Sequence, residues 1–295
     1  MTSTSLERLA ALPVRRKTRV LSRWVPAVLI AAIVVGIGWA FISAPAMRWD
    51  VVGEYLFAPR IVSGVGTTIL FTVLTFVIGL LLGLLVTVMR QSGNPVLAVA
   101  CGAYIWLFRG TPLLVQLVFW FNLALIFPYL GVRIPAWGIA IGGDANDLIS
   151  PFTAALVGLT LHSAAYMAEV VRGGFLAVPG GQVDAALAIG MTELEAQRHV
   201  VIPQAIRVIL PPLGNQFIDI LKATSIVSVI GGGDLMTRAQ QIYGQNYQVI
   251  ALLVVASLWY LVLVTVATLG QSWLERSLDR GRHRRPAVIA TEVTA

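Results

Sequence analysis

Charged residues are scarce in this sequence, and cysteine is almost absent. Asp, Glu, Lys and Arg make up 12% of the 295 residues, whereas soluble domains use about 25%. The 57% of hydrophobic residues also excludes a disordered chain, which needs few apolar residues and much charge. A single cysteine, Cys101, excludes a disulfide framework. The composition therefore predicts an integral membrane protein.

The few lysines and histidines stand in no catalytic or metal-binding pattern. A phosphate-binding loop requires Gly-Lys-Ser/Thr, but Lys17 follows Arg16 and Lys222 follows Leu221. The three histidines share no metal-ligand spacing, and neither a Gly-x-Ser-x-Gly nor an H-E-x-x-H pattern occurs. The sequence therefore predicts no metal site, no cofactor bound by this chain and no catalysis by it, which argues against a membrane-embedded enzyme.

Long uncharged runs predict an all-α, polytopic transmembrane bundle of about six helices. A helix needs roughly 20 apolar residues to cross a hydrocarbon core about 30 Å thick. The third predicted span is interrupted by Arg109, Gly110 and Pro112, and the fifth contains Asp219 and Lys222. The predicted spans cover residues 24–47 (apolar as far as about residue 42), 61–89, 95–127, 152–168, 208–230 and 249–273.

The positions of lysine and arginine predict which side of the membrane each end occupies. Most of the 21 cations fall in segments on the same side as both termini, so both termini are expected in the cytoplasm. Attraction to anionic lipid accounts for the net charge of +7 without a nucleic-acid partner. The predicted organisation is a basic segment 1–23, an additional N-terminal helix 24–43, a core 61–273 and a basic tail 274–295.

The sequence Ala44–Pro45–Ala46 mimics the cleavage site of a signal peptide, which is the alternative for the first span. The apolar run before it is longer than such a peptide uses, and a long basic segment precedes the run. An uncleaved membrane anchor is therefore expected.

The segment between the fourth and fifth spans carries helix signals on both sides of a glycine. Residues 184–189 are good helix formers with an acid expected in the first turn, and Gly190 suits a left-handed C-terminal cap. Thr192 and Glu195 have the spacing of a capping box, which predicts a second short helix. Pro203 is expected to interrupt the pattern before the chain re-enters the membrane.

These signals predict a helix, a glycine turn and a helix lying at the membrane surface. Small side chains at Ala185 and Ala186 would allow a groove of another protein to approach the backbone closely. An ordinary connecting loop is the alternative.

Four motifs follow one another along the chain. They are Phe108–Gln116, Ala165–Gly174, the loop with Asp184–Ala185–Ala186, Gly190 and Ile202–Pro203, and the stretch Pro203–Phe217 continuing to Leu221–Ser225. Together they resemble the permease subunits of ABC importers, in particular the polar-amino-acid branch, over about residues 61–273. The chain departs from the family at Asp184, where Glu is usual, and its first span lies outside the matched core.

The resemblance implies a type I ABC importer permease (MetI-like) fold and a division of labour with other proteins. ATP and Mg would be used by a cytoplasmic ABC ATPase dimer, with loop 180–200 as the coupling helix that docks into it. A second copy or a homologous permease would complete the pore, and a periplasmic or extracellular solute-binding protein would deliver an amino acid. The chain would lie in the bacterial cytoplasmic (inner) membrane. The implied coupling residues are Gln182, Asp184, Ala185, Ala186 and Gly190.

The predicted outer loops support a separate receptor. They comprise residues 44–60, 128–150 and 232–248, and each is too short to form a solute-binding domain.

Charged side chains within the spans are functional candidates, because a charge at mid-membrane costs about 2.5–3.5 kcal/mol on insertion scales. Arg109 is expected near mid-membrane beside a broken helix, where it binds a substrate carboxylate or, alternatively, loosened backbone carbonyls. Asp219 and Lys222 form an ion pair or, alternatively, Lys222 lines the path with Thr224 and Ser225. The predicted substrate path comprises Arg109, Thr111, Gln116, Lys222, Thr224 and Ser225.

Three further polar residues share one face of the fourth predicted helix, close to its cytoplasmic end. Tyr166, Glu169 and Arg172 are spaced three apart, which favours a cytoplasmic gate or loop anchor over substrate recognition. Gln116 and His162 either line the path or make an interhelical hydrogen bond.

The sequence thus predicts a permease subunit of an ATP-driven, solute-binding-protein-dependent importer that carries a polar amino acid. The alternative is an ion-coupled secondary transporter, driven through Glu169 or Asp219 and independent of an ATPase. Export is disfavoured because the loop pattern is typical of importers in the resembled family.

Overall fold

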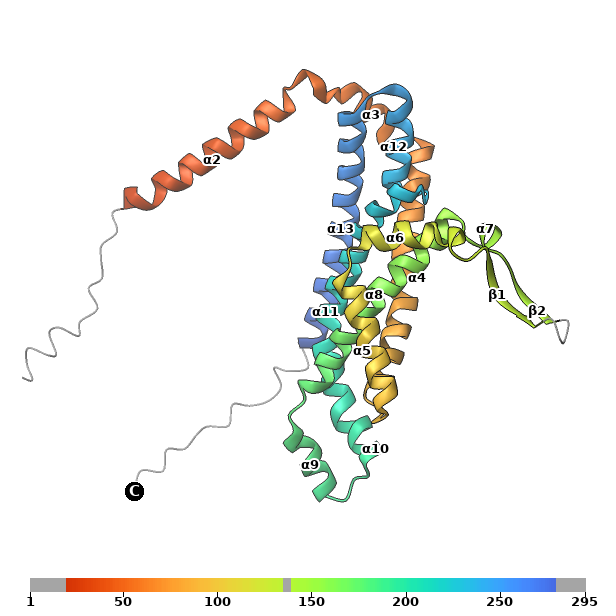
Figure 1. Cartoon of the computed structure of the whole chain (residues 1–295). Helices are drawn as coiled ribbons and strands as arrows, with labels where there is room; N and C mark the ends of the chain where they lie inside the picture. Colours follow the sequence, from red (N-terminus) through yellow and green to blue (C-terminus); the bar gives the residue numbers. More distant parts are fainter. Residues whose placement is uncertain (1–19, 135–138, 280–295) are drawn as a thin grey trace, which may run out of the picture. The chain divides into compact units, whose positions relative to one another are not determined.

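The structure, a computed structural model, describes residues 20–134 and 139–279. It divides into two units, Met1–Trp49 and Asp50–Ala295. Helices make up most of the described chain (Figure 1), which confirms the predicted all-α class. The elements are α2 (Val20–Ile42), η1 (Pro45–Met47), α3 (Trp49–Leu56), α4 (Pro59–Arg90), α5 (Pro95–Gly110), α6 (Leu113–Phe121), η2 (Leu123–Leu125), β1 (Tyr129–Ile134), β2 (Ile139–Asp144), α7 (Ala145–Leu148), α8 (Pro151–Leu176), α9 (Gly180–Ala188), α10 (Glu193–Ala196), η4 (Gln197–Val201), α11 (Ile202–Ala223), η5 (Thr224–Ile230), α12 (Leu235–Asn246) and α13 (Val249–Asp279).

The first unit contains the additional N-terminal helix. Its stretch Trp24–Ile42 is 19 residues long and apolar enough to cross a membrane, and no residue of it is buried. A helix that is apolar on every side suits a lipid environment. The predicted first span is therefore present as a helix, and residues 1–19 lie outside the described part of the chain.

The second unit contains the other predicted spans. In the described residues of the whole chain, four helices are long and apolar enough to cross a membrane, or up to six if each of two bent helix pairs counts as one span. The bent pairs are α5 with α6, at 104°, and Glu193–Ile230 with α12, at 42°. The first pair coincides with the third predicted span, where Gly110 and Pro112 lie, whereas the second bend follows the end of the fifth predicted span, between Ile230 and Leu235.

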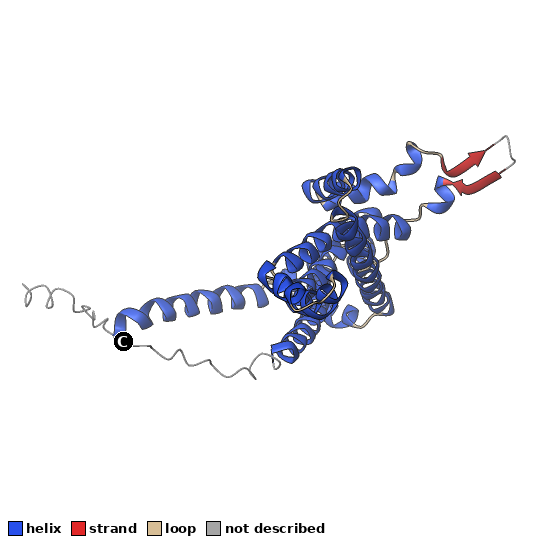
Figure 2. Cartoon of the chain, turned by 90° about the horizontal axis from the view of Figure 1, so that it is seen from below, coloured by secondary structure: helices blue, strands red, loops and turns tan. Residues whose placement is uncertain are grey.

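Two of the predicted outer loops contain regular structure. Segment 232–248 is mostly helix α12, whose Leu235, Ala239 and Ile242 are buried. Segment 128–150 contains an antiparallel hairpin of β1 and β2, in which Tyr129 pairs with Asp144, followed by α7. Figure 2 shows this hairpin as the strand structure of an otherwise helical unit. The loop between the strands, residues 135–138, is outside the described residues.

Small residues bring α4 and α8 close together at the centre of the second unit. A Cβ on Gly83 would lie 3.0 Å from the backbone nitrogen of Ala168 and 3.0 Å from Cβ of Met167. The Thr87 hydroxyl donates to the Ala168 carbonyl, 3.0 Å away. Glycine at a helix contact and a hydroxyl bonded across it are features of helix pairs in membranes. This contact fixes the position of α8, which carries several of the candidate site residues.

We expect Gly83→Ala to lower the free energy of unfolding by about 1–3 kcal/mol, because the new methyl group overpacks the contact with α8. Gly66→Ala is the matched control, since it lies on the same helix and a Cβ there would have no atom within 4 Å. Thermal unfolding of the purified protein in detergent measures the difference, and equal midpoints for the two variants would contradict this account of the packing.

Three buried apolar clusters hold the remaining helices. One joins α3, α4, α12 and α13 around Ile61, Leu235 and Leu252. A second joins α4, α6, α8 and η5 around Phe71 and Leu117. The third joins α8 and α11 and includes six buried residues: Met167, Val171, Ala205, Ile209, Leu213 and Ile220. Helix α5 is joined to α8 by the Tyr104 hydroxyl, which donates to the Leu161 carbonyl at 2.6 Å. The helices α5, α8 and α11, which carry the candidate charges, therefore belong to one packed unit.

Candidate functional site

The break predicted in the third span is a sharp bend between α5 and α6. α5 ends at Gly110, Thr111 and Pro112 have extended backbones, and α6 begins at Leu113. The Gln116 side chain is 7% exposed, and its Nε2 donates to the carbonyl of Phe108 at 3.0 Å and to Oγ1 of Thr111 at 2.7 Å. Gln116 therefore binds backbone carbonyls that the bend leaves without helical partners. Of its two predicted roles, this is the hydrogen bond between helices rather than the lining of the path.

Arg109 is exposed at the end of α5 and faces an aromatic ring of α8. Its guanidinium carbon lies 5.1 Å from the centre of the Tyr166 ring, within cation–π range. The His162 ring is 5.0 Å from the same tyrosine ring. Among described residues, Arg109 makes no ion pair, so its charge is available to a ligand.

Glu169 binds two arginines near the end of α8. Its Oε1 lies 2.5 Å from Nη1 of Arg90, and its Oε2 lies 2.6 Å from Nη2 of Arg172. The sequence spacing predicted the pair with Arg172. Arg90, at the end of α4, was missed because it is 79 residues away in the chain. This cluster joins α4 to α8, which agrees with the predicted anchor role. Both arginines are paired with the Glu169 carboxylate.

Asp219 and Lys222 form the ion pair that their spacing predicts. Oδ1 and Nζ are 2.8 Å apart, and the side chains are 60% and 56% exposed on α11. Thr224 is fully buried, with its hydroxyl donating to the Leu221 carbonyl at 2.7 Å. Ser225 is half-buried and donates to the Lys222 carbonyl at 2.7 Å. Lys222 is accessible in this conformation, whereas Thr224 is not.

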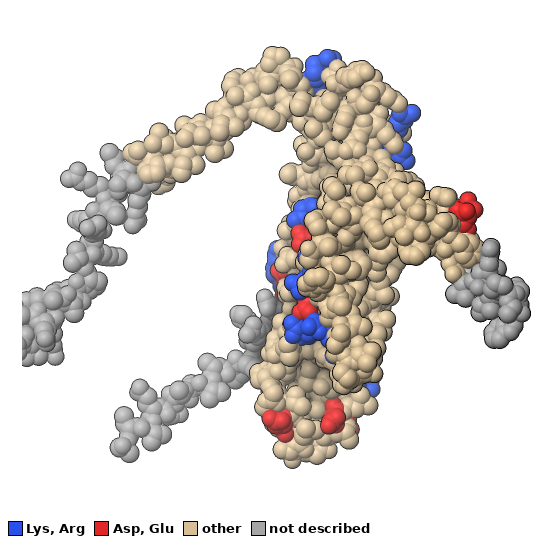
Figure 3. All heavy atoms as spheres, in the orientation of Figure 1, with Lys and Arg blue, Asp and Glu red and all other residues tan. Residues whose placement is uncertain are grey.

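The predicted path residues thus fall into two separate groups. Arg109, Thr111 and Gln116 lie at the α5–α6 bend, and Lys222 with Ser225 lies on α11 and η5. Among the described residues, no hydrogen bond or ion pair joins the two groups. Figure 3 shows a row of basic and acidic side chains on an otherwise uncharged face of the bundle. Such a row is costly against lipid.

The loop between α8 and α11 has the predicted helix–glycine–helix form. Gly190 follows α9 with a φ of +91°, so its left-handed conformation is confirmed. The capping box is also confirmed, because the Thr192 amide donates to Oε2 of Glu195 at 2.9 Å and the Glu195 amide donates to Oγ1 of Thr192 at 3.3 Å. These contacts define a short second helix, α10.

The structure corrects one expectation about this loop and refines another. α9 begins at Gly180, so Asp184 lies in its second turn and no acid occupies the first. Pro179 precedes the helix in an extended conformation and starts it one turn earlier than helix propensity suggests. Pro203 lies in the first turn of α11, directly after the π-helical turn η4, so the regular α-helical pattern is interrupted there while the chain stays helical. Proline cannot donate the backbone hydrogen bond that a continuous α-helix requires at this position.

The loop buries one of its two predicted contact alanines and exposes the other. Ala186 is 4% exposed, whereas Ala185 faces solvent. Ile189 and Leu194 are 77% and 78% exposed, so the loop presents apolar side chains at the end of the bundle that carries α9 and α10 (Figure 1). Gln182 is tied to α11 by a 2.6 Å bond from Gln204. Exposed apolar residues on a short, well-capped loop are typical of a protein contact surface.

Sequence comparison identifies relatives that cover most of the chain. The arginine transport system permease protein ArgU of Corynebacterium glutamicum is 40% identical over 266 residues, covering 89% of this chain and 82% of that protein. The glutamine transport system permease protein GlnP of Escherichia coli is 34% identical over 236 residues, covering 79% of this chain and 98% of that protein. These relatives are transport permeases, and they lend no support to the alternative of an ion-coupled secondary transporter.

Structure comparison agrees with the sequence relatives. A crystal structure of an amino acid ABC transporter with histidines matches with a TM-score of 0.64 and 37% identity, covering 75% of this chain and 95% of that one. The family described as "binding-protein-dependent transport system inner membrane component" matches residues 77–280, and this range includes α5, α8, the α9–α10 loop and α11. The chain belongs to this family of transport permeases.

Proposed function

We propose that this chain is the membrane-spanning permease subunit of an ATP-driven importer that carries a polar amino acid across the bacterial cytoplasmic (inner) membrane. The observation that supports it most strongly is the similarity, over 89% of the chain, to an arginine transport permease. Relatives carry names of arginine, cystine and glutamine systems, so these three amino acids are the first substrates to test.

ATP and Mg belong to a separate cytoplasmic ABC ATPase dimer in this proposal, and the α9–α10 loop docks into it. Ala185 supplies a small exposed contact, with Gln182 and Asp184 exposed on the same helix. The buried Ala186 and the left-handed Gly190 shape the loop from within. In this proposal the loop lies in the cytoplasm, as do both termini, since most lysines and arginines fall on their side of the predicted topology.

A second permease, either another copy or a homologue, covers the charged row on the bundle. Asp219 and Lys222 are more than half exposed in a helix that belongs to a candidate span. Facing lipid, each charge would cost about 2.5–3.5 kcal/mol on insertion scales. A pore formed between two permeases keeps these side chains in water instead.

The exposed charges suit an amino acid in zwitterionic form. Arg109 and Lys222 can donate charge-assisted hydrogen bonds to its α-carboxylate, and Asp219 can accept hydrogen bonds from its α-ammonium group. Ser225 lies beside Lys222 on this route. Thr111 and Gln116 support the bend that positions Arg109. Tyr166, Glu169 and Arg172 act as a cytoplasmic gate or anchor, held to α4 by Arg90.

Affinity purification of the tagged chain from its own membrane tests the assembly. The proposal predicts that an ABC ATPase and a second permease chain are recovered with it in mild detergent, and that subunit mass distinguishes a second copy from a homologue. Recovery of the chain alone and monomeric, with transport activity, would contradict the proposal.

A further inference from the structure

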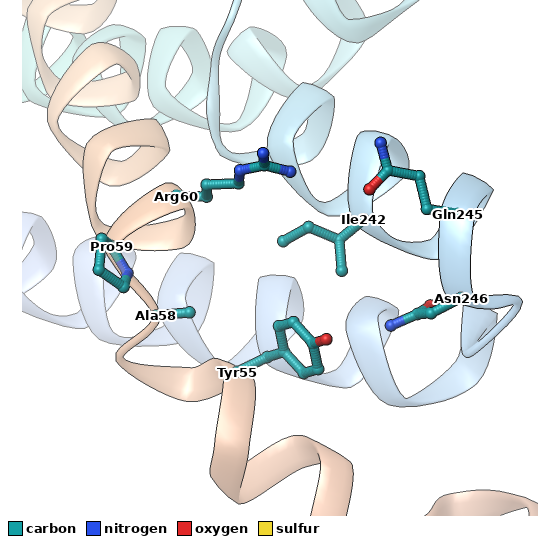
Figure 4. Close-up of a pocket in the computed structure, with 7 residues that line it drawn as sticks. All are labelled: Tyr55, Ala58, Pro59, Arg60, Ile242, Gln245 and Asn246. Carbon is teal, nitrogen blue, oxygen red and sulfur yellow. The ribbon is translucent and has the colours of Figure 1, made fainter.

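A cavity of about 450 Å³ lies between α3, the start of α4 and the end of α12. Its seven lining residues are Tyr55, Ala58, Pro59, Arg60, Ile242, Gln245 and Asn246. Figure 4 shows Arg60 and Gln245 extending toward this space from opposite sides, with Ile242 between them. None of the lining residues belongs to the substrate path or to the coupling loop.

Three polar groups of this cavity have hydrogen-bond donors without an acceptor among the described residues, and Gln245 adds an amide that can both donate and accept. Arg60 is exposed, and its guanidinium makes no hydrogen bond or ion pair with any described residue. Oδ1 of Asn246 accepts a hydrogen bond from the Gln248 amide at 3.0 Å. The Nδ2 group of Asn246 therefore remains available as a donor. The Tyr55 hydroxyl also lacks a partner among the described residues. A guanidinium together with an amide and a hydroxyl donor is the complement of a carboxylate.

The lining residues include no Asp or Glu. A free amino acid would bring an α-ammonium group as well as its carboxylate, and nothing in the cavity lining carries the negative charge to balance that group. An aspartate or glutamate side chain of a protein presents a carboxylate on a short apolar stem instead. Ala58, Pro59 and the buried Ile242 offer apolar surface for such a stem.

The cavity lies at the end of the bundle opposite α9 and α10 (Figure 1). If the α9–α10 loop faces the ATPase, as the proposed function requires, the cavity opens on the outer side of the membrane. The family to which the chain belongs depends on a binding protein for transport. That protein must reach the permease from this side.

We propose that this cavity is a docking socket for an acidic side chain of the external solute-binding protein, and that Arg60 is its main contact. This inference rests on the proposed function. Opposite charges across an interface raise the association rate and favour one docking orientation, so the socket sets the affinity for the binding protein.

The test uses the full transporter in lipid nanodiscs, with its ATPase and the substrate-loaded binding protein. ATPase rate is measured against binding-protein concentration at two ionic strengths. Arg60→Gln is expected to raise the half-saturating concentration about tenfold, equivalent to about 1.4 kcal/mol, while the maximal rate is still reached. The salt dependence should weaken in the variant, and Arg60→Lys should restore most of the affinity.

Arg238→Gln is the matched control, because Arg238 lies on the same helix as Gln245 but bonds Gln241 at 3.1 Å and does not line the cavity. It should leave the half-saturating concentration within about twofold of that of the unaltered protein, because Arg238 is half-buried and does not line the cavity. The socket proposal would be overturned if both variants changed the half-saturating concentration equally, or if Arg60→Gln did not change it. A loss of maximal uptake with unchanged binding-protein affinity would also overturn it, in favour of a substrate contact. If no binding protein stimulates the unaltered transporter at all, the proposed function itself fails.

Discussion

Ala185→Arg is expected to reduce ATP-driven uptake about 5- to 150-fold while the membrane bundle stays folded. The Ala185 side chain is exposed on α9, so an arginine there extends into solvent without disturbing the loop. In the proposed complex, however, it would occupy the space into which the ATPase fits closely, and forced overpacking costs about 1–3 kcal/mol, a factor of about 5 to 150 in docking. Co-purification of the ATPase and uptake into proteoliposomes measure the effect.

Ala185→Ser is the matched control at the same position, since serine adds one oxygen atom and should retain uptake. Two other substitutions in the loop test docking less cleanly. Ala186→Arg would place a long charged side chain at a position where the alanine is only 4% exposed, and would disturb the loop itself. Gly190→Asp would strain a backbone with a φ of +91°. Normal uptake by Ala185→Arg with its ATPase bound would show that the coupling surface lies elsewhere.

Arg109→Ala is expected to lower amino-acid uptake about 10- to 100-fold, while assembly and binding-protein-stimulated ATP hydrolysis survive. Among the described residues its guanidinium contacts the Tyr166 ring at 5.1 Å and forms no ion pair, so removing it leaves no carboxylate unpaired. The expected loss is that of one charge-assisted contact to the substrate, about 1.5–3 kcal/mol.

Initial uptake rates over a range of substrate concentrations measure this effect in the reconstituted complex. Arg207→Ala is a matched control, because Arg207 is also exposed on the described surface but lies outside the predicted path. Unchanged uptake kinetics in Arg109→Ala would show that Arg109 does not line the path. Its role would then be structural, through the cation–π contact with Tyr166 of α8.

Local sequence signals predicted much of the fold. Gly110 and Pro112 break the third span because neither residue supports the helix interior, and the bend of 104° lies where they do. The Thr192–Glu195 capping box and the cap at Gly190 also depend on neighbouring residues alone. Features set within one helical turn are visible in the order of the residues.

Features that depend on tertiary contacts were not visible. Arg90 and Glu169 are 79 residues apart, and a single sequence carries no signal that joins them. Helix α12 reads as a polar outer loop by hydropathy because it contains Arg238 and several glutamines, yet its apolar side packs against α4 and α13. The burial of Ala186 likewise results from how the loop folds back on itself, which composition does not determine.

Uptake of a radiolabelled polar amino acid into proteoliposomes tests the central claim most directly. The vesicles contain the purified permease and its ATPase, with ATP on the ATPase side and the loaded binding protein on the other. The account predicts accumulation that requires ATP, the ATPase and the binding protein together, and that persists when an ionophore collapses ion gradients. Uptake by this chain alone, abolished by the ionophore and indifferent to ATP, would contradict it.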